Sequence, residues 1–269
     1  MRIPAIVKIT LGTVVGAVLV FVYLPLAVVA FNSFNASQNL AWPPRAFTLK
    51  WWGRALHDAG ALHALGTSIL VAACATAAAL VLGTLAAIAL DRFEFFGKES
   101  VNLLIILPIA LPGIITGIAL NNAFTTMLGL PLGLITVIIA HVTFCIVTIY
   151  NNAFARMRRL NGNLRDAAMD LGADSFTTFR LVTFPQLRSA LFAGSLLAFG
   201  LSFDEIIVTQ FTAGTSVQTL PIWIFNNMFR PGQAPIVDVV ATFLVIVSII
   251  PIALANRIGG KESIQANAA

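Results

Sequence analysis

Residues 65–90 read LGTSILVAACATAAALVLGTLAAIAL, an apolar run without a single charged side chain. About 20 such residues, each rising 1.5 Å along an α-helix, span the ~30 Å hydrocarbon core of a bilayer. The run is long enough to do so, and it predicts a membrane-spanning helix. Its many alanines, together with Gly83, allow neighbouring helices to approach closely, as in a helix bundle.

Five further stretches of the chain have the same apolar character. The composition agrees, because hydrophobic residues make up 58% of the sequence and charged residues 10%, against about 25% in soluble domains. We therefore expect an all-α, polytopic membrane protein with six transmembrane helices in a single domain over residues 1–269. The five stretches run from about Ile9 to Phe31, Val101 to about Leu120, Leu132 to Tyr150, about Ser189 to Phe211 and Ile236 to about Asn256.

Two prolines interrupt the third stretch. Pro108 and Pro112 each remove a backbone hydrogen bond and bend a helix. Carbonyls freed in this way need partners, so this helix is expected to pack within protein or to line a cavity. A fixed kink and a moving hinge both fit the pattern.

The distribution of charge sets the expected orientation. The formal net charge is +5, but the Arg and Lys residues lie between apolar runs rather than on one soluble face, which argues against nucleic-acid binding. If the N-terminus is cytoplasmic, only four of the 16 basic residues fall on the outer side, as the positive-inside rule requires. Both termini are therefore expected to be cytoplasmic. The four outer residues are Arg45, Lys50, Arg54 and Arg230.

The sequence carries no pattern that predicts catalysis or a resident cofactor. It lacks the G-x-x-x-x-G-K-[ST] loop that cradles ATP phosphates, and no Ser/His/Asp or Cys/His set is suggested by the spacing. Cys74 and Cys145 lie in apolar runs without metal-ligand spacing, and both are expected to be packing residues. His141, in the fourth stretch, is expected to be a hydrogen-bonded bundle residue rather than a ligand. We expect no catalytic residue, no metal and no cofactor in this chain.

The inward loop over about residues 151–188 is the longest, and its pattern is partly helical. Leu164, Ala168 and Leu171 recur at three- and four-residue spacing, as on one helix face. Gly172 suits the turn that ends such a helix, and Pro185 is expected to stop the next helical segment before the fifth span. The loop is therefore expected to be solvated or docked on a soluble protein.

The spacing of Asp166-Ala167-Ala168, Gly172 and Phe184-Pro185 in this loop resembles the cytoplasmic signature of ABC-importer permeases. That signature reads Glu-Ala-Ala, three residues, Gly, nine residues, Ile, one residue, Leu-Pro. The spacing agrees throughout, while Asp, Val and Phe replace Glu, Ile and Leu. Residues 107–120, 201–205, 211–214 and 219–222 are also similar to permeases of the spermidine/putrescine type. The residues that match the signature are Asp166-Ala167-Ala168, Gly172, Val182 and Phe184-Pro185.

The resemblance implies a type I ABC importer permease in the bacterial inner membrane. Its partners would be a second permease subunit, a dimer of ATP-binding subunits that holds ATP and Mg, and a periplasmic substrate-binding protein. The chain would move putrescine, spermidine or another small amino-bearing solute inward by alternating access. The coupling segment that docks on the ATP-binding subunits would contain Asp166, Ala167, Ala168, Gly172 and Pro185.

Two acids lie deep within the fifth stretch, where a charge at the bilayer centre costs about 2.5–3.5 kcal/mol. On one continuous helix, Glu205 would share a small, polar face with other residues while Asp204 points about 100° away. We expect Glu205 to line the substrate path, with Asp204 second and aromatic faces nearby for a cation. Alternatively, both acids cap helix ends or pair with the partner permease. The expected path residues are Glu205, Asp204, Ser202, Thr209, Phe211 and Trp223.

Two other classes of protein are less consistent with the sequence. A stand-alone secondary transporter is typically built from inverted repeats with discontinuous helices. No convincing repeat is visible, and this class leaves the cytoplasmic signature unexplained. An intramembrane enzyme would have to use Asp204 and Glu205 as an acid/base pair, but neighbours on a helix point about 100° apart.

Overall fold

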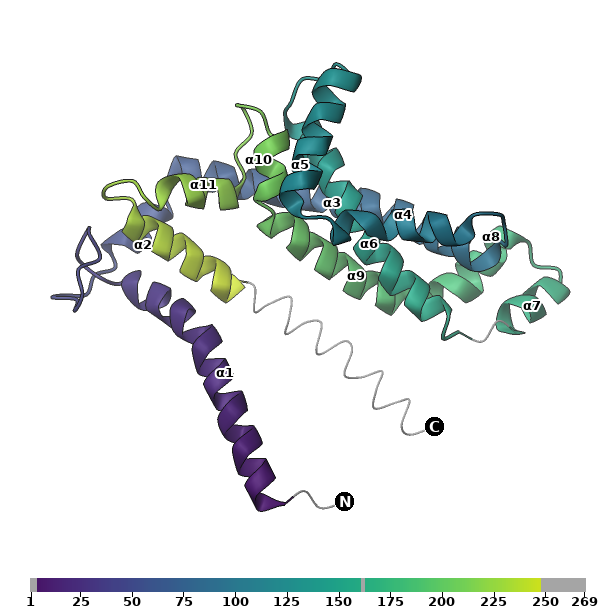
Figure 1. Cartoon of the computed structure of the whole chain (residues 1–269), viewed down its shortest axis with the longest axis horizontal. Helices are drawn as coiled ribbons and strands as arrows, with labels where there is room; N and C mark the ends of the chain where they lie inside the picture. The colour runs from purple at the N-terminus through teal and green to yellow at the C-terminus, as the bar shows by residue number, and fades with distance from the viewer. Residues whose placement is uncertain (1–3, 161–162, 248–269) are drawn as a thin grey trace. The chain divides into compact units, whose positions relative to one another are not determined.

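The computed structural model describes residues 4–160 and 163–247, and over these ranges the chain is helical (Figure 1). The only β-structure in these ranges is an isolated bridge between Asn35 and Phe47. The all-α prediction is therefore confirmed. The elements are α1 (Ala5–Asn32), α2 (Lys50–Ala55), α3 (Ala59–Arg92), α4 (Lys98–Ala110), α5 (Gly113–Asn122), the π-helix η1 (Ala123–Met127), α6 (Leu134–Met157), α7 (Asn163–Asp170), α8 (Ser175–Thr178), the π-helix η2 (Phe179–Thr183), α9 (Phe184–Asp204), α10 (Ile207–Thr212), α11 (Leu220–Asn227) and a short apolar helix over Ala234–Val247.

Four helices within the described ranges are long and apolar enough to cross a membrane. They are α1, α3, α6 and the helix that runs over Ser175–Asp204, and the bent pair of α4 and α5 makes a fifth if it counts as one span. The sixth predicted span begins in the helix over Ala234–Val247, and its remainder lies outside the described residues. Six transmembrane helices therefore stay a prediction.

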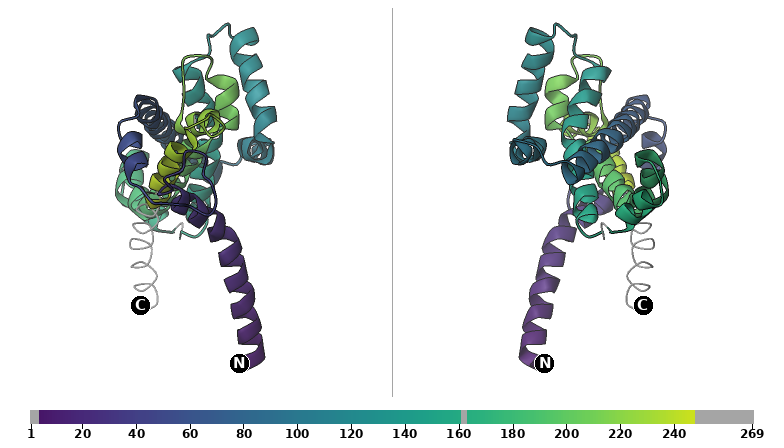
Figure 2. Two further views of the ribbon diagram at one scale, coloured as in Figure 1. Left: turned by 90° about the vertical axis from the view of Figure 1, so that its left-hand side faces the viewer. Right: turned by 90° about the vertical axis from the view of Figure 1, so that its right-hand side faces the viewer.

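The described chain forms two compact units. The first holds residues 4–62 and 223–247, and in it α1 is one continuous helix whose most apolar window has no buried residue (Figure 2). Trp51 is buried at the start of α2, and its indole Nε1 donates a hydrogen bond to the carbonyl O of Asn35 at 2.9 Å. The exposed apolar surface of α1 fits a lipid or protein environment rather than water.

The second unit holds residues 63–160 and 163–222 and contains both candidate sites. Helix α6 is central to it and packs against α4, α9 and α10. The small residues of α3 allow close packing on α6, as predicted: a Cβ added to Gly83 would lie 2.9 Å from the carbonyl O of Ile146. Cys145 is buried and its thiol donates to the carbonyl O of Ala198, whereas Cys74 is exposed on α3.

The third predicted span is not one helix. Its two halves, Lys98–Ala110 and Gly113–Met127, meet at an angle of 107° (Figure 1). Leu111 is extended, with ψ at 143°, because the ring of Pro112 disfavours helical angles in the residue before it. Pro112 is the N-cap residue of α5, which begins at Gly113. The predicted bend is present, and it is sharper than a proline kink within a continuous helix.

Candidate functional site

The cytoplasmic signature folds into a short helix that ends in a tight cap. Asp166, Ala167 and Ala168 lie on α7. Gly172 follows with a φ of +84°, the left-handed angle that residues with a Cβ rarely adopt. The Gly172 N–H donates to Met169 O at 2.9 Å, and the Ala173 N–H donates to Ala168 O at 3.0 Å. This hydrogen-bond pair is the Schellman motif, which explains why glycine stands at this position.

The surface around α7 is apolar and exposed. Leu171 is 90% exposed, Phe176 68% and Met169 52%. Asp166, Ala167 and Gly172 are exposed as well. Exposed apolar side chains gathered around a charged helix are typical of a surface that another protein covers.

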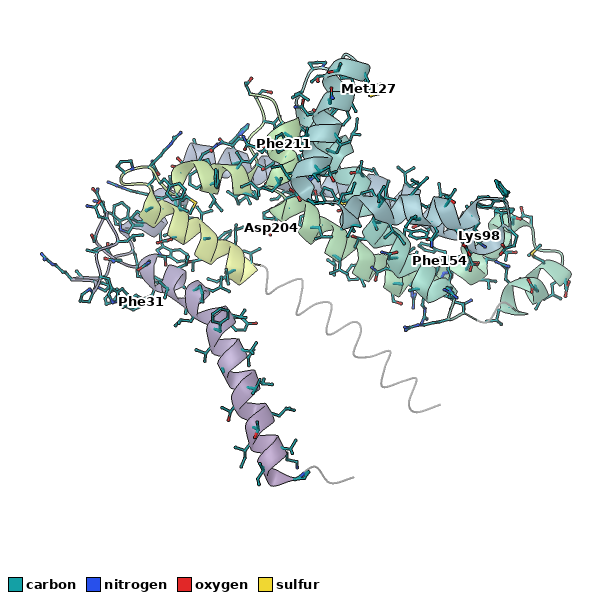
Figure 3. The ribbon with its side chains drawn as sticks, in the orientation of Figure 1. Phe31, Lys98, Met127, Phe154, Asp204 and Phe211 are labelled. Carbon is teal, nitrogen blue, oxygen red and sulfur yellow. The ribbon has the colours of Figure 1, made fainter. Side chains whose placement is uncertain are left out.

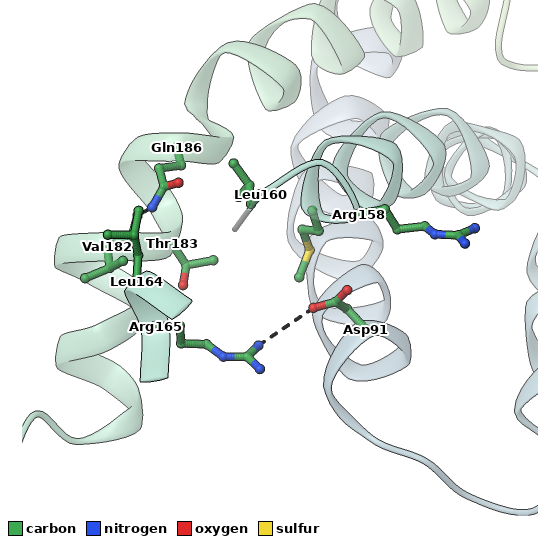
Figure 4. Close-up of a pocket in the computed structure, with 9 residues that line it drawn as sticks. Asp91, Arg158, Leu160, Leu164, Arg165, Val182, Thr183 and Gln186 are labelled. Atoms are coloured by element: carbon green, nitrogen blue, oxygen red, sulfur yellow. Dashed lines mark hydrogen bonds and ion pairs between the residues drawn. The ribbon is translucent and has the colours of Figure 1, made fainter. Parts of the chain in front are cut away.

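An ion pair joins α7 to the membrane-crossing helix α3. Arg165 Nη1 lies 3.7 Å from Asp91 Oδ2 in the last turn of α3 (Figure 4). Arg165 Nε also lies 3.8 Å from Asp166 Oδ1. The pair borders a cavity of about 240 Å³, which Thr183 of η2 and Arg158 at the end of α6 also line. Elements that lie far apart in the sequence therefore meet beside α7.

The chain from Ser175 to Asp204 is continuous helix, so the prediction that Pro185 stops the segment before the fifth span is wrong. Asp174 begins α8, and its Oδ1 accepts a hydrogen bond from the Thr177 N–H at 2.8 Å. Hydrogen bonds from Thr177 lower the pKa of the Asp174 carboxyl. Pro185 stands in the first turn of α9, directly after the π-helix η2, where a missing N–H is tolerated. The α7–α8 segment is thus linked to the fifth span by helix.

The fifth predicted span breaks at the two acids, so the assumption of one continuous helix is wrong. Helix α9 ends at Asp204, Glu205 is extended with ψ at 120°, and α10 begins at Ile207. Glu205 Oε1 accepts a hydrogen bond from the Val208 N–H at 2.8 Å, which caps the new helix. The alternative that an acid caps a helix end is therefore what the structure shows for Glu205.

Ser202 and Thr209 lie in the core rather than at an exposed surface. Ser202 is 3% exposed and Thr209 is wholly buried. Both contact His141 of α6, through Nδ1 to Ser202 Oγ at 2.7 Å and through Nε2 to Thr209 Oγ1 at 2.8 Å. The prediction that His141 is a hydrogen-bonded bundle residue is confirmed. In this structure no surface accessible to a solute is formed by Ser202 or Thr209.

The remaining path candidates lie on three different helices. Asp204 is exposed at the end of α9, and Figure 3 shows it together with Phe211. Phe211 is half-buried on α10 and packs on Gly117 of α5, where an added Cβ would lie 2.7 Å from its ring. Trp223 is 5% exposed in α11 and belongs to the first unit. Within the second unit, the structure places Asp166, Ala167 and Ala168 on α7 and Gly172 in its cap, whereas Ser202 and Thr209 are buried and Asp204 is exposed.

Several residues of the two sites were not singled out by the sequence. Asp91 and Arg165 are separated by more than 70 positions, and no spacing rule links an acid at the end of one helix to a distant arginine. Asn121 was also missed, although its Nδ2 donates to the Phe211 carbonyl O at 2.6 Å. A polar side chain in an apolar stretch predicts that it has a polar partner, but it does not predict which residue that partner is. Within the described ranges, no three His, Cys, Asp or Glu side chains are grouped to hold a metal ion.

The fold and the exposed α7 together define a class of protein: a helical membrane component with a short exposed helix outside its spans. The chain belongs to the family of binding-protein-dependent transport system inner membrane components, which matches residues 79–260. The match covers α7, both broken spans and the contacts of Arg165 and His141.

Two relatives are similar over most of the chain. The putrescine transport system permease protein PotI of Escherichia coli (strain K12) is 36% identical over 231 residues, which are 83% of this chain and 81% of PotI. The spermidine/putrescine transport system permease protein PotC of the same strain is 30% identical over 257 residues, which are 95% of this chain and 96% of PotC. The resemblance to this type of permease is confirmed.

A solved structure has the same fold. A bacterial ABC transporter involved in the import of the acidic polysaccharide alginate contains a chain that matches with a TM-score of 0.72 at 15% sequence identity. The match covers 97% of this chain and 99% of that chain. The predicted type I permease fold is thus confirmed, whereas identity at this level says nothing about the solute.

Proposed function

We propose that this chain is the non-catalytic permease subunit of an ATP-driven importer that moves putrescine, spermidine or a similar small cationic amine inward. The observation that carries this proposal is α7, an exposed helix that is fixed to a membrane-crossing helix through Arg165 and Asp91. A soluble subunit that binds α7 would transmit its movement to α3 through this ion pair. The two compact units act as one transmembrane domain in this proposal, in the bacterial inner membrane with both termini cytoplasmic.

The energy for transport comes from partner chains in this proposal. A dimer of ATP-binding subunits, which holds ATP and Mg, docks on Asp166, Ala167, Ala168 and the turn at Gly172. A second permease subunit completes the path, and a periplasmic binding protein delivers the solute. The exposure of Leu171 and Phe176 beside the signature supports docking of a protein at this place.

The proposed solute is supported by the relatives and by one exposed acid. PotI and PotC are named as putrescine and spermidine/putrescine permeases, and both match this chain over four fifths of its length or more. Asp204 is exposed in a membrane-crossing segment, and no ion pair of Asp204 is present within residues 4–160 and 163–247. An exposed carboxylate in such a segment needs water, a cavity or a cation beside it. Attraction of a cationic amine satisfies that need.

A stand-alone secondary transporter is the weaker reading, although the structure does contain broken helices. Such breaks occur in secondary transporters. They do not explain an exposed, capped helix outside the spans, and the family to which the chain belongs transports with a binding protein.

The test is uptake of radiolabelled putrescine and spermidine into membrane vesicles that hold this chain with its genomic partners, with and without ATP. The expected result is ATP-dependent uptake that disappears when this chain is omitted. Uptake that needs no ATP and no partner would overturn the importer proposal. Coupled ATP hydrolysis stimulated only by a different amino-bearing solute would leave the importer proposal standing and replace the solute.

A further inference from the structure

A buried imidazole joins the two halves of the broken fifth span. His141 of α6 has no exposed surface, and it contacts Ser202 of α9 with Nδ1 and Thr209 of α10 with Nε2. The stretch between Ser202 and Thr209 contains the break and both acids, Asp204 and Glu205. One side chain thus touches both sides of the segment that carries the acids.

The break is what allows a single ring to make both contacts. In a continuous α-helix, residues seven apart are displaced by roughly 10.5 Å along the axis. One imidazole with hydrogen bonds of ordinary length from both nitrogens joins two oxygens no more than roughly 8 Å apart. Ser202 and Thr209 are seven positions apart, so the two bonds together depend on the departure from helical geometry at Glu205.

For a neutral ring, the hydrogen bonds of this cluster assign the tautomer of His141. The Thr209 hydroxyl donates to the carbonyl O of Glu205 at 2.9 Å, so towards His141 it acts as an acceptor. Nε2 of the ring is therefore the N–H donor, and Nδ1 accepts from the Ser202 hydroxyl. The contacts run from α9 through the ring to α10 and end on the backbone of the break itself. Loss of any member leaves a buried polar group without its partner.

We propose that His141 is a positioning residue of the transport path: with Ser202 and Thr209 it holds the break and so fixes where the Asp204 and Glu205 carboxylates lie. The inference rests on the proposed function, because it assigns the acids to the path of a cationic solute. It also gives Ser202 and Thr209 a different role from the one expected from the sequence. They act on the path through His141 and the backbone rather than by contact with the solute.

The experiment compares Thr209, whose hydroxyl contacts His141 and the Glu205 carbonyl O, with a second threonine of α10. Thr209 and Thr212 are both wholly buried, but the Thr212 hydroxyl donates to Val208 O within its own helix at 2.9 Å. Valine has nearly the same shape as threonine and lacks the hydroxyl. Thr209→Val removes the bonds to His141 and to Glu205 O and is expected to raise the KM of amine uptake about tenfold or more, whereas Thr212→Val is expected to leave it within about twofold.

A second pair of variants tests whether Thr209 acts through the ring. In His141→Asn the shorter side chain keeps a group near Nδ1 and loses the contact to Thr209. Combined with Thr209→Val, it is expected to cost clearly less than the sum of the two changes, because both remove the bond between Nε2 and Thr209. Additive losses, or equal KM values for Thr209→Val and Thr212→Val, would overturn the proposal.

A labelling measurement separates failure of this inference from failure of the proposed solute. Ile207 is 44% exposed at the start of α10, and Cys74 is exposed whereas Cys145 is buried. In the assembled complex with Cys74→Ser and Ile207→Cys, the rate of maleimide labelling reports on the break. Thr209→Val is expected to change this rate several-fold and Thr212→Val to leave it unchanged. A changed rate without any amine uptake would keep the positioning role and reject the solute, and an unchanged rate would reject the positioning role.

Discussion

Arg165 Nη1 lies 3.7 Å from Asp91 Oδ2, so α7 is joined by an ion pair to the last turn of a membrane-crossing helix. The side chains are 33% and 26% exposed, and a pair as accessible as this is worth about 1 kcal/mol or less in stability. Its importance is therefore expected in the transmission of motion rather than in the free energy of unfolding.

Removal of this ion pair should lower the amount of solute moved per ATP. Arg165→Gln and Asp91→Asn are each expected to reduce that ratio about threefold, and the double variant is expected to be no worse than either, because the same pair is lost. Arg158→Gln is the matched control, since Arg158 lines the same cavity but lies over the ring of Phe154. Uptake and ATP hydrolysis measured on the same vesicles give the ratio. Equal losses in the control would show that any arginine of this cavity matters.

The left-handed turn at Gly172 should not tolerate a side chain. Gly172→Val places a β-branched residue at a φ of +84°, which costs about 1–2 kcal/mol and disturbs the cap of α7. ATP hydrolysis is expected to become independent of uptake, or the ATP-binding subunits to dissociate on purification. Gly232→Val is the control, because Gly232 has a φ of +77°, equally open surroundings and a place outside the signature. Normal coupled uptake by Gly172→Val would contradict the assignment of α7.

The parts of the fold that follow from local pattern were predictable, and the parts that depend on distant contacts were not. The run over residues 65–90 predicts α3 because length and apolarity suffice for a spanning helix. The Ala168-to-Gly172 spacing likewise predicts the end of α7, since a Schellman cap is formed by neighbouring residues. The break at Glu205 was missed because the apolar sequence on both sides of it predicts a single continuous helix. The hydrogen bonds at the break come from Thr209, which follows it in α10, and from His141, which lies in α6 and is distant in the sequence.

The close approach of α5 to α10 should depend on the absence of a side chain at Gly117. A Cβ there would lie 2.7 Å from the Phe211 ring, so Gly117→Ala is expected to push the two helices apart and to lower the thermal midpoint of the purified complex by several degrees. Gly200→Ala is the control. Gly200 is helical, a Cβ added to it would meet no atom of a neighbouring element within 4 Å, and alanine there favours the helix. A similar thermal midpoint for both variants would show that Phe211 can move aside without cost.

The two acids of the break should respond differently to loss of charge. Glu205→Gln keeps an oxygen that can accept from the Val208 N–H, so the cap of α10 and the assembly are expected to survive while uptake changes modestly. Asp204→Asn removes the exposed charge and is expected to lower uptake of a dicationic amine at least tenfold at equal assembly. Asp58→Asn is the matched control, because Asp58 Oδ1 accepts from the Ala61 N–H near the start of α3 and lies outside the break. The measurement is the initial rate of putrescine uptake in vesicles that contain equal amounts of complex. If Glu205→Gln fails to assemble while Asp204→Asn transports normally, the acids serve the fold and the cation path must be formed by other residues.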